Sequence, residues 1–240
     1  MTEPLYFLPG TMCDSRLWSP LWAELNTLQA KLSVDYDFIH LTIPVENTID
    51  EIVETLAKQL PKEKINLLGF SQGGYLASAF ACRYPERMKR LINLSNAPQQ
   101  LPYEEIATRS KIIRWVETHG YSGITLARIR TFLHASQQAN TDITDCIKQM
   151  DHDFGANALL QQLKSTTVRQ DLILALTSLT CSMLFCYGDS DLLVDGKFFA
   201  PLLTTNTNIS VEVFNDCGHM LPLESPLLLA KAIIRFLQTS

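Results

Sequence analysis

The sequence lacks the features that mark membrane and exported proteins. No run of apolar residues is long enough to cross a bilayer. The N-terminal residues MTEPLYFLPG contain no basic segment followed by a long apolar stretch, as a secretory leader would. These absences argue against a membrane span or export signal. We therefore expect a soluble, cytoplasmic protein with no membrane partner.

Concentrated positive charge is absent as well. The chain carries 20 Lys and Arg against 25 Asp and Glu, a formal net charge of −5, and the basic residues are scattered. Binding to a phosphate backbone or an anionic membrane surface needs a basic patch. We expect no nucleic-acid partner. Nothing in the sequence indicates the oligomeric state.

Paired cysteine spacing of the kind found in metal sites is also missing. None of the 6 cysteines belongs to a CxxC motif, and most lie in apolar runs. We interpret them as reduced, buried or half-buried thiols. The acidic segment GDSDLLVDG does not match a calcium loop, because the required glycine and distal glutamate are absent at their offsets. The sequence predicts no metal and no organic cofactor.

What the sequence does contain is a regular alternation of two patterns. With 240 residues, 46% of them hydrophobic, the chain can bury one sizeable core. Short apolar or β-branched runs alternate with longer segments of helical periodicity, which is typical of a largely parallel sheet flanked by helices. The predicted strands are 5–8, 34–41, 65–70, 91–94, 183–187 and 209–214. The predicted helices are 14–28, 48–60, 72–84, 194–203 and 224–237, with Asp14 and Ser225 as N-caps and Pro226 at a first helical position.

One interval departs from this alternation. From Pro98 to about Thr166 the sequence has helical segments, at 103–119 and 141–150, but no convincing strand. We predict that residues 98–166, called the insertion segment below, form a helical cap between two strands of a single domain spanning residues 1–240.

A serine held between glycines ends one predicted strand. The residues GFSQG match the G-x-S-x-G elbow, in which a nucleophile sits on a strained turn between a strand and a helix. Gly69 and Gly73 provide the small neighbours that such a turn needs. A glycine-rich turn with an incidental serine is the alternative, but it does not explain the Ser, Asp, His order that follows. We predict that Ser71 is a nucleophile.

A serine hydroxyl needs a histidine base, which in turn needs a carboxylate to orient it. His219 lies in NDCGHMLPLESP, after the last predicted strand, and is the predicted base. The predicted acid is Asp191, the fourth position counted from Gly188 at the end of the preceding strand. Asp189 is too near the strand, and Asp195 lies within or caps the next helix. The remaining histidines are expected to have packing or surface roles: His40, His119, His134 and His152.

An oxyanion needs two hydrogen-bond donors. The backbone N–H of Gln72 follows the nucleophile, and the loop LPGTMCDSRLW after the first strand offers that of Thr11. Met12 and Cys13 either line an acyl pocket or simply pack in the core.

These segments resemble the α/β-hydrolase superfamily, in the branch of small carboxylesterases and pimeloyl-ACP methyl ester esterases. The likeness rests on LPGTMCDSRLW, LLGFSQGGYLASAFACRYPERMKRLINLSNAP, LFCYGDSDLLV and VFNDCGHMLPLESP, and it weakens through the insertion segment, which takes the place of the family's cap. It implies an α/β-hydrolase fold. It also implies a nucleophile at Ser71, an acid at Asp191, a base at His219 and oxyanion donors at Thr11 and Gln72.

The sequence departs from the family pattern at two places. Pro9 precedes Gly10 where the family usually has histidine, and the segment after the second strand is shortened to HLTIPVENT. Serine as the nucleophile argues against the aspartate-based branches, the haloalkane dehalogenases and epoxide hydrolases. Tyr75 stands where the lyase of menaquinone synthesis has an arginine, which disfavours that activity.

The expected function is therefore a serine hydrolase that cleaves carboxylic esters of small to medium apolar acyl groups through an acyl-enzyme. Its partner is a small-molecule ester. The same residues serve thioester hydrolysis, acyl transfer or carbon–carbon bond cleavage, and some proteins of this fold only bind a ligand. Apolar residues of the insertion segment, Trp115 and Phe132 among them, either cover the site or form that segment's own core. Four arginines either meet an acidic substrate or lie on a solvated helix face: Arg109, Arg114, Arg128 and Arg130.

Overall fold

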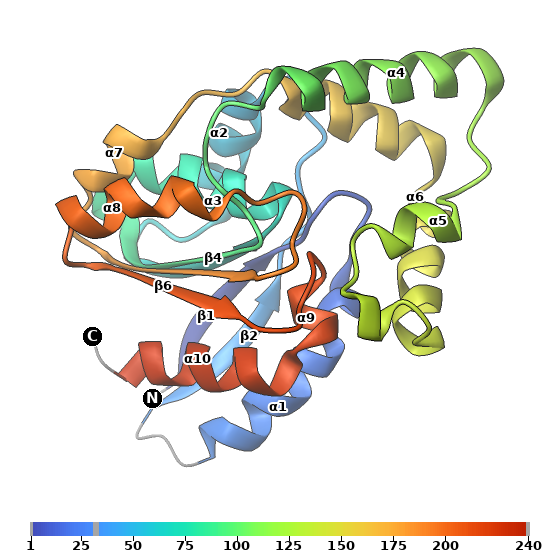
Figure 1. Ribbon diagram of the computed structural model, residues 1–240. Coiled ribbons are helices and arrows are strands. Elements are labelled where there is room, and N and C mark those ends of the chain that lie inside the picture. Colours follow the sequence, from blue (N-terminus) through green and yellow to red (C-terminus); the bar gives the residue numbers. More distant parts are fainter. Residues whose placement is uncertain (1, 31–33, 239–240) are drawn as a thin grey trace.

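A computed structural model describes residues 2–30 and 34–238. A six-stranded sheet forms its centre, with all neighbouring strands parallel and in the order β2-β1-β3-β4-β5-β6 (Figure 1). The strands are β1 (Thr2–Leu8), β2 (Asp35–His40), β3 (Ile65–Phe70), β4 (Met88–Leu94), β5 (Ser182–Gly188) and β6 (Ile209–Phe214). The predicted class, a mostly parallel sheet flanked by helices, is confirmed. The bounds predicted for β3 and β6 agree with those observed.

Helices cover both faces of this sheet (Figure 1). One face carries α1 (Ser19–Gln29) and α10 (Pro226–Gln238), and the other carries α2 (Ile49–Gln59), α3 (Gln72–Arg83) and α8 (Phe199–Thr205). Two apolar layers result, one on each side of the sheet. A sheet covered in this way needs strands that are apolar on both faces.

Strand β1 shows how one segment serves both layers. Leu5 and Phe7 belong to the layer under α1 and α10, whereas Tyr6 and Leu8 belong to the opposite layer. Successive side chains of a strand point to opposite faces, so a continuous apolar run is the expected pattern here. The central strand β3 is buried at every position for the same reason.

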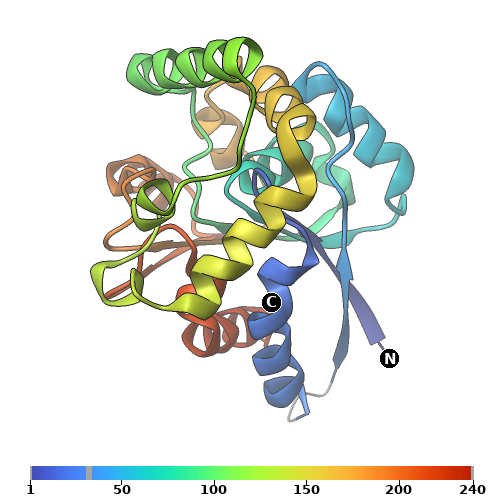
Figure 2. The ribbon, with the colours of Figure 1, turned by 90° about the vertical axis from the view of Figure 1, so that its right-hand side faces the viewer.

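The chain between β4 and β5 is helical throughout its regular parts, and these residues contain no strand. Its elements are α4 (Tyr103–His119), α5 (Leu126–Arg130), η3 (Ala135–Gln137), α6 (Thr141–Thr167) and α7 (Ile173–Thr177). In Figure 1 the strand arrows point towards α5 and α6, and Figure 2 shows α6 crossing that end of the sheet. The carboxyl ends of the strands therefore lie beneath these helices.

The predicted helix 141–150 was too short. Helix α6 continues to Thr167, with one non-helical residue at Gly155, where φ is +68°. Glycine adopts this conformation at little steric cost, so two helical stretches meet at a kink there.

Three predicted helix starts also needed correction. The segment 14–28 begins as η1 (Ser15–Trp18), capped by Asp14 as predicted, and α1 starts only at Ser19. The segment 194–203 likewise begins as η4 (Gly196–Phe198). The last helix begins at Pro226, which occupies its first position as predicted, after the short α9 (Leu221–Glu224). Prolines favour first turns because they lack the N–H that a helix interior uses, so Pro20 and Pro226 start new helices.

The cysteines are all unpaired thiols, and no helix within the described ranges is long and apolar enough to cross a membrane. Cys13, Cys181, Cys186 and Cys217 are buried, and Cys82 and Cys146 are half-buried.

Candidate active site

The turn from β3 into α3 has an unusual backbone conformation at Ser71. Its φ is +51° and its ψ is −115°, a region that side-chain-bearing residues rarely adopt. The turn is fixed on both sides, because Ser71 N–H donates to the carbonyl of Leu94 at 2.8 Å and the carbonyl of Ser71 accepts from Tyr75 N–H at 3.1 Å. The half-buried Ser71 side chain thus lies at the carboxyl end of the central strand.

The glycines around Ser71 are sterically required. A Cβ at Gly69 would lie 2.1 Å from the carbonyl oxygen of Gly73, and one at Gly73 would lie 2.3 Å from that of Leu8. Gly74 allows α3 to approach the sheet, since a Cβ there would lie 2.9 Å from the Cβ of Asn96. No side chain fits without moving backbone, so the elbow depends on this sequence of small residues.

His219 and Asp191 lie beside the serine. His219 Nε2 is 3.0 Å from Ser71 Oγ, and His219 Nδ1 is 2.8 Å from Asp191 Oδ2. The Asp191 side chain is fully buried, and its other oxygen accepts the N–H of Leu193 at 2.8 Å. A carboxylate held in this way fixes the imidazole with its Nε2 lone pair towards the hydroxyl.

The other acidic residues of the same loop lie elsewhere. Asp189 accepts hydrogen bonds from Ser190 Oγ at 3.0 Å and Cys217 N–H at 3.4 Å. Asp195 caps η4 by accepting the N–H of Lys197 at 3.0 Å. Asp191 is the aspartate of this loop whose carboxylate meets His219.

The remaining histidines make local contacts. Trp18 Nε1–H donates to His40 Nδ1 at 3.2 Å, and His119 stacks on Trp115 with ring centroids 4.0 Å apart. His134 lies 3.8 Å from Asp216 and His152 lies 3.3 Å from the neighbouring Asp153.

The two predicted oxyanion residues are joined through their side chains. Thr11 Oγ1–H donates to Gln72 Oε1 at 2.7 Å. Neither backbone N–H has an acceptor within the described part of the chain, which leaves both free to receive an oxygen from a ligand. Gln72 is 6% exposed, and its Nε2 is buried without a partner.

Comparisons with known proteins agree with the observed fold. The family model described as "alpha/beta hydrolase fold" matches residues 9–121, which include the Thr11 loop and the Ser71 elbow. A thermophilic esterase from Thermogutta terrifontis superposes with a TM-score of 0.80 at 22% sequence identity, over 98% of this chain and 89% of the esterase. The chain has the fold of the α/β hydrolases.

Two curated relatives are also similar to this chain. The biotin biosynthesis bifunctional protein BioHC of Teredinibacter turnerae is 25% identical over 98% of this chain and 44% of its own length. The pimeloyl-[acyl-carrier protein] methyl ester esterase of Shewanella woodyi is 30% identical over 40% of this chain and 37% of its own length. The chain thus spans less than half of the length of each of these two relatives.

Contacts from the helical segment reach both loops of the site. Gln162 on α6 accepts the N–H of Met12 at 2.9 Å, where Met12 has φ of +56°. Met12 packs against Val116, Leu159 and other apolar residues of α4 and α6, whereas Cys13 belongs to the main core. Gln162 was missed from the sequence because the predicted helix ended at residue 150.

On the base side, the backbone of His219 donates to the carbonyl of Phe132 at 2.7 Å. The Phe132 ring and the Phe70 ring both lie near the imidazole, with centroid distances of 5.9 Å and 5.3 Å. A Cβ at Gly218 would lie 2.6 Å from the backbone of His134. The base loop and the chain after α5 are therefore in direct backbone contact.

Glu224 on α9 connects the His219 loop to the chain after α5. One carboxylate oxygen accepts from His134 N–H at 2.7 Å and Gly218 N–H at 3.1 Å, and the other accepts from Met220 N–H at 3.0 Å. Burial raises the pKa of this carboxyl above its usual value, against the three N–H groups and the charge of His219, which lower it. The sequence analysis missed Glu224. Its signal in the sequence is an acidic residue five positions after His219, in an otherwise apolar segment.

Replacing Gly73 with alanine tests the steric argument for the elbow. We expect Gly73→Ala to lower the free energy of unfolding by roughly 2–4 kcal/mol, because the new methyl group would overlap backbone atoms that are fixed in place. Urea unfolding followed by circular dichroism measures this change. Ala79→Gly, which alters one methyl group on the same helix, serves as the control and should cost about 1 kcal/mol. Equal effects of the two substitutions would contradict the argument.

Proposed function

We propose that the protein is a serine hydrolase that cleaves esters through an acyl-enzyme on Ser71. The observation that supports this most strongly is the continuous hydrogen-bonded series from Asp191 through His219 to Ser71 Oγ. Its hydroxyl projects from a strained elbow at the end of β3. This combination of strained serine, oriented imidazole and buried carboxylate is suited to nucleophilic attack on a carbonyl.

The reaction proceeds in two halves. His219 Nε2 takes the proton from Ser71 Oγ as the oxygen bonds to the ester carbonyl carbon, and the backbone N–H groups of Thr11 and Gln72 receive the resulting oxyanion. His219 then gives the proton to the departing alkoxide, which leaves as the alcohol. Water, deprotonated by His219, attacks the acyl-enzyme, and release of the acid restores Ser71.

Ester substrates are favoured by the printed names of similar proteins, among them the methyl ester esterase of S. woodyi and the esterase of T. terrifontis. The apolar surroundings favour an apolar acyl group, because Phe132 lies against His219 and Met12 packs among apolar residues of α4 and α6. In this proposal the insertion segment, residues 98–166, serves as the cap over the site.

Turnover of p-nitrophenyl esters tests both the activity and the acyl preference. We expect wild-type protein to hydrolyse esters of short and medium chains and Ser71→Ala to lose at least about 10³-fold in kcat, because the substitution removes the hydroxyl that His219 deprotonates. Ser110→Ala, an exposed serine on α4, is the matched control and should keep full activity. If wild type turns over no ester, a ligand-binding role becomes the better account.

The choice of Asp191 over its neighbour can be tested with isosteric variants. Asp191→Asn should reduce kcat by about 10³- to 10⁴-fold, since the amide no longer stabilises the protonated imidazole or holds its tautomer. Asp189→Asn, two residues away in the same loop, should change kcat by no more than a few-fold. The account would fail if Asp189→Asn proved the more damaging variant.

Glu224 should hold the His219 loop in its working position. Its carboxylate accepts the N–H groups of His134, Gly218 and Met220. Glu224→Gln keeps one carbonyl acceptor but places an NH2 donor where the second carboxylate oxygen was, so at least one of these hydrogen bonds is lost. We expect kcat/KM for p-nitrophenyl esters to fall roughly tenfold, because the base is no longer held in place.

The comparison variant for this test is Glu212→Gln, at a glutamate paired with Arg235 on the surface. It should keep the wild-type kcat/KM. An equal kcat/KM in wild type and Glu224→Gln, or an equal fall in the two variants, would contradict this role of Glu224.

A further inference from the structure

Arg169 lies between α6 and α7 without a counter-ion. Its guanidinium carbon is 4.7 Å from the ring centroid of Tyr75, and its Nε is buried with no hydrogen-bond partner. No carboxylate in the described ranges lies within 4.0 Å of its nitrogens, and its Nη groups make no hydrogen bond there. The side chain is half-buried. A buried N–H without a partner is costly, so this arrangement calls for a physical explanation.

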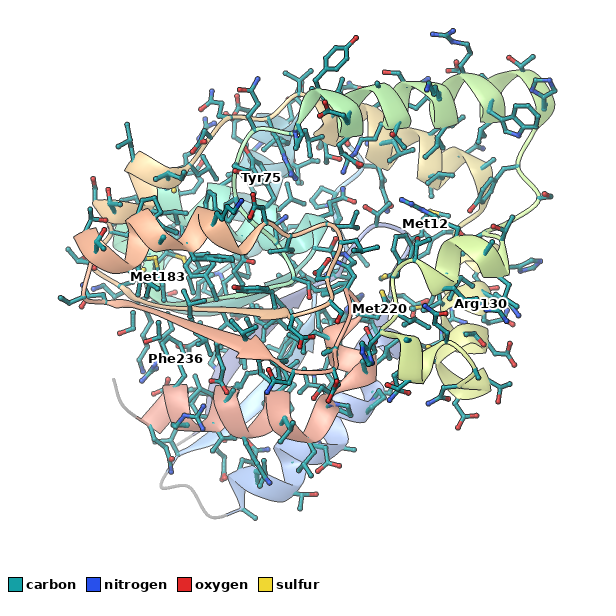
Figure 3. The ribbon with its side chains drawn as sticks, viewed as in Figure 1. Met12, Tyr75, Arg130, Met183, Met220 and Phe236 are labelled. Carbon is teal, nitrogen blue, oxygen red and sulfur yellow. The ribbon has the colours of Figure 1, made fainter. Side chains whose placement is uncertain are left out.

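The Tyr75 side chain next to Arg169 is held in place. Tyr75 is 3% exposed, and its hydroxyl donates to the carbonyl of Gln170 and accepts from the N–H of Gln170, both at 2.9 Å. Leu172 N–H donates to the carbonyl of Pro98 at 3.0 Å. Figure 3 shows Tyr75, which belongs to α3, well apart from Met12 and Met220. The Tyr75 ring and the residues that follow Arg169 are thus held before any ligand arrives.

A second guanidinium lies close to the first. Arg109 on α4 donates from Nε to Glu105 at 2.9 Å and from Nη1 to Thr166 Oγ1 at 3.2 Å, three residues before Arg169. Burial, followed by the like charge of Arg109, lowers the pKa of Arg169 to about 10. Glu105 pairs with Arg109, which leaves the charge of Arg169 without a counter-ion within 4.0 Å in the described ranges.

The geometry also limits how a ligand could approach. The guanidinium carbon lies 4.7 Å from the Tyr75 ring centroid and the Nε–H is buried, so polar contacts with a ligand are left to the Nη groups. A planar fork of N–H donors matches two oxygens of a carboxylate or a phosphate. A methionine or lysine would cover the Tyr75 ring as well, without a buried unpaired Nε–H.

We propose that Arg169, assisted by Arg109, binds the carboxylate or phosphate group of a ligand where α3, α4 and the α6–α7 connection meet. This site shares no residue with Ser71, His219, Asp191 or the oxyanion loop. It does not depend on the ester-hydrolase proposal, and it is tested by binding alone.

The test uses the full chain and two probes, inorganic phosphate and malonate, each at constant ionic strength balanced with sodium chloride. Isothermal titration calorimetry and thermal unfolding should both detect saturable binding of at least one probe to wild type. Arg169→Met should weaken that binding by about tenfold or more, and Arg109→Met by several-fold. Arg114→Met, at an exposed arginine on the same helix as Arg109, should bind as wild type does.

Arg169→Lys separates this role from folding. It keeps the charge and the aliphatic stem but loses the planar fork, so it should fold and bind the probe several-fold more weakly. The stronger probe identifies the group, phosphate or carboxylate. Binding that is absent in wild type, or equal in wild type, Arg169→Lys and Arg169→Met, would overturn the proposal.

Discussion

The strained backbone of Ser71 is the constraint on which the rest of the site depends. A positive φ at a residue with a side chain is unfavourable, and it persists only where the surroundings determine it. Here the hydrogen bonds to Leu94 and Tyr75 and the close packing at Gly69 and Gly73 do so. The sheet supplies these contacts because β3 lies between β1 and β4. Burial of the two apolar layers that enclose the sheet stabilises the fold and offsets the free-energy cost of this strained turn.

The helices between β4 and β5 are tied to both halves of the site. Gln162 binds the backbone of the Thr11 loop, and the carbonyl of Phe132 binds the backbone of His219. Glu224 adds a third connection, between the His219 loop and His134. A displacement of these helices would therefore move the base and the oxyanion loop together. In the proposed mechanism, the same segment that excludes water from the site also aligns it.

Much of the fold could be predicted from local pattern. The apolar runs of β3 and β6 and the Gly-Ser-Gly sequence are short-range signals, and Asp191 could be chosen over Asp189 from its place in the turn. The features that were missed depend on contacts between residues far apart in the chain. Gln162 meets Met12 across 150 positions, and Glu224 meets His134 across 90. The continuation of α6 past Gly155 and the unpaired Arg169 likewise depend on what packs against them, which no window of sequence contains.

The central claim is that Ser71, and no other residue, is the activated nucleophile. Incubation of the protein with a fluorophosphonate, followed by intact-mass measurement and peptide mapping, tests this most directly. The account predicts one adduct per chain, on Ser71, that forms much more slowly when His219 is replaced by alanine. An adduct on a different residue, or one whose rate is indifferent to His219, would contradict it.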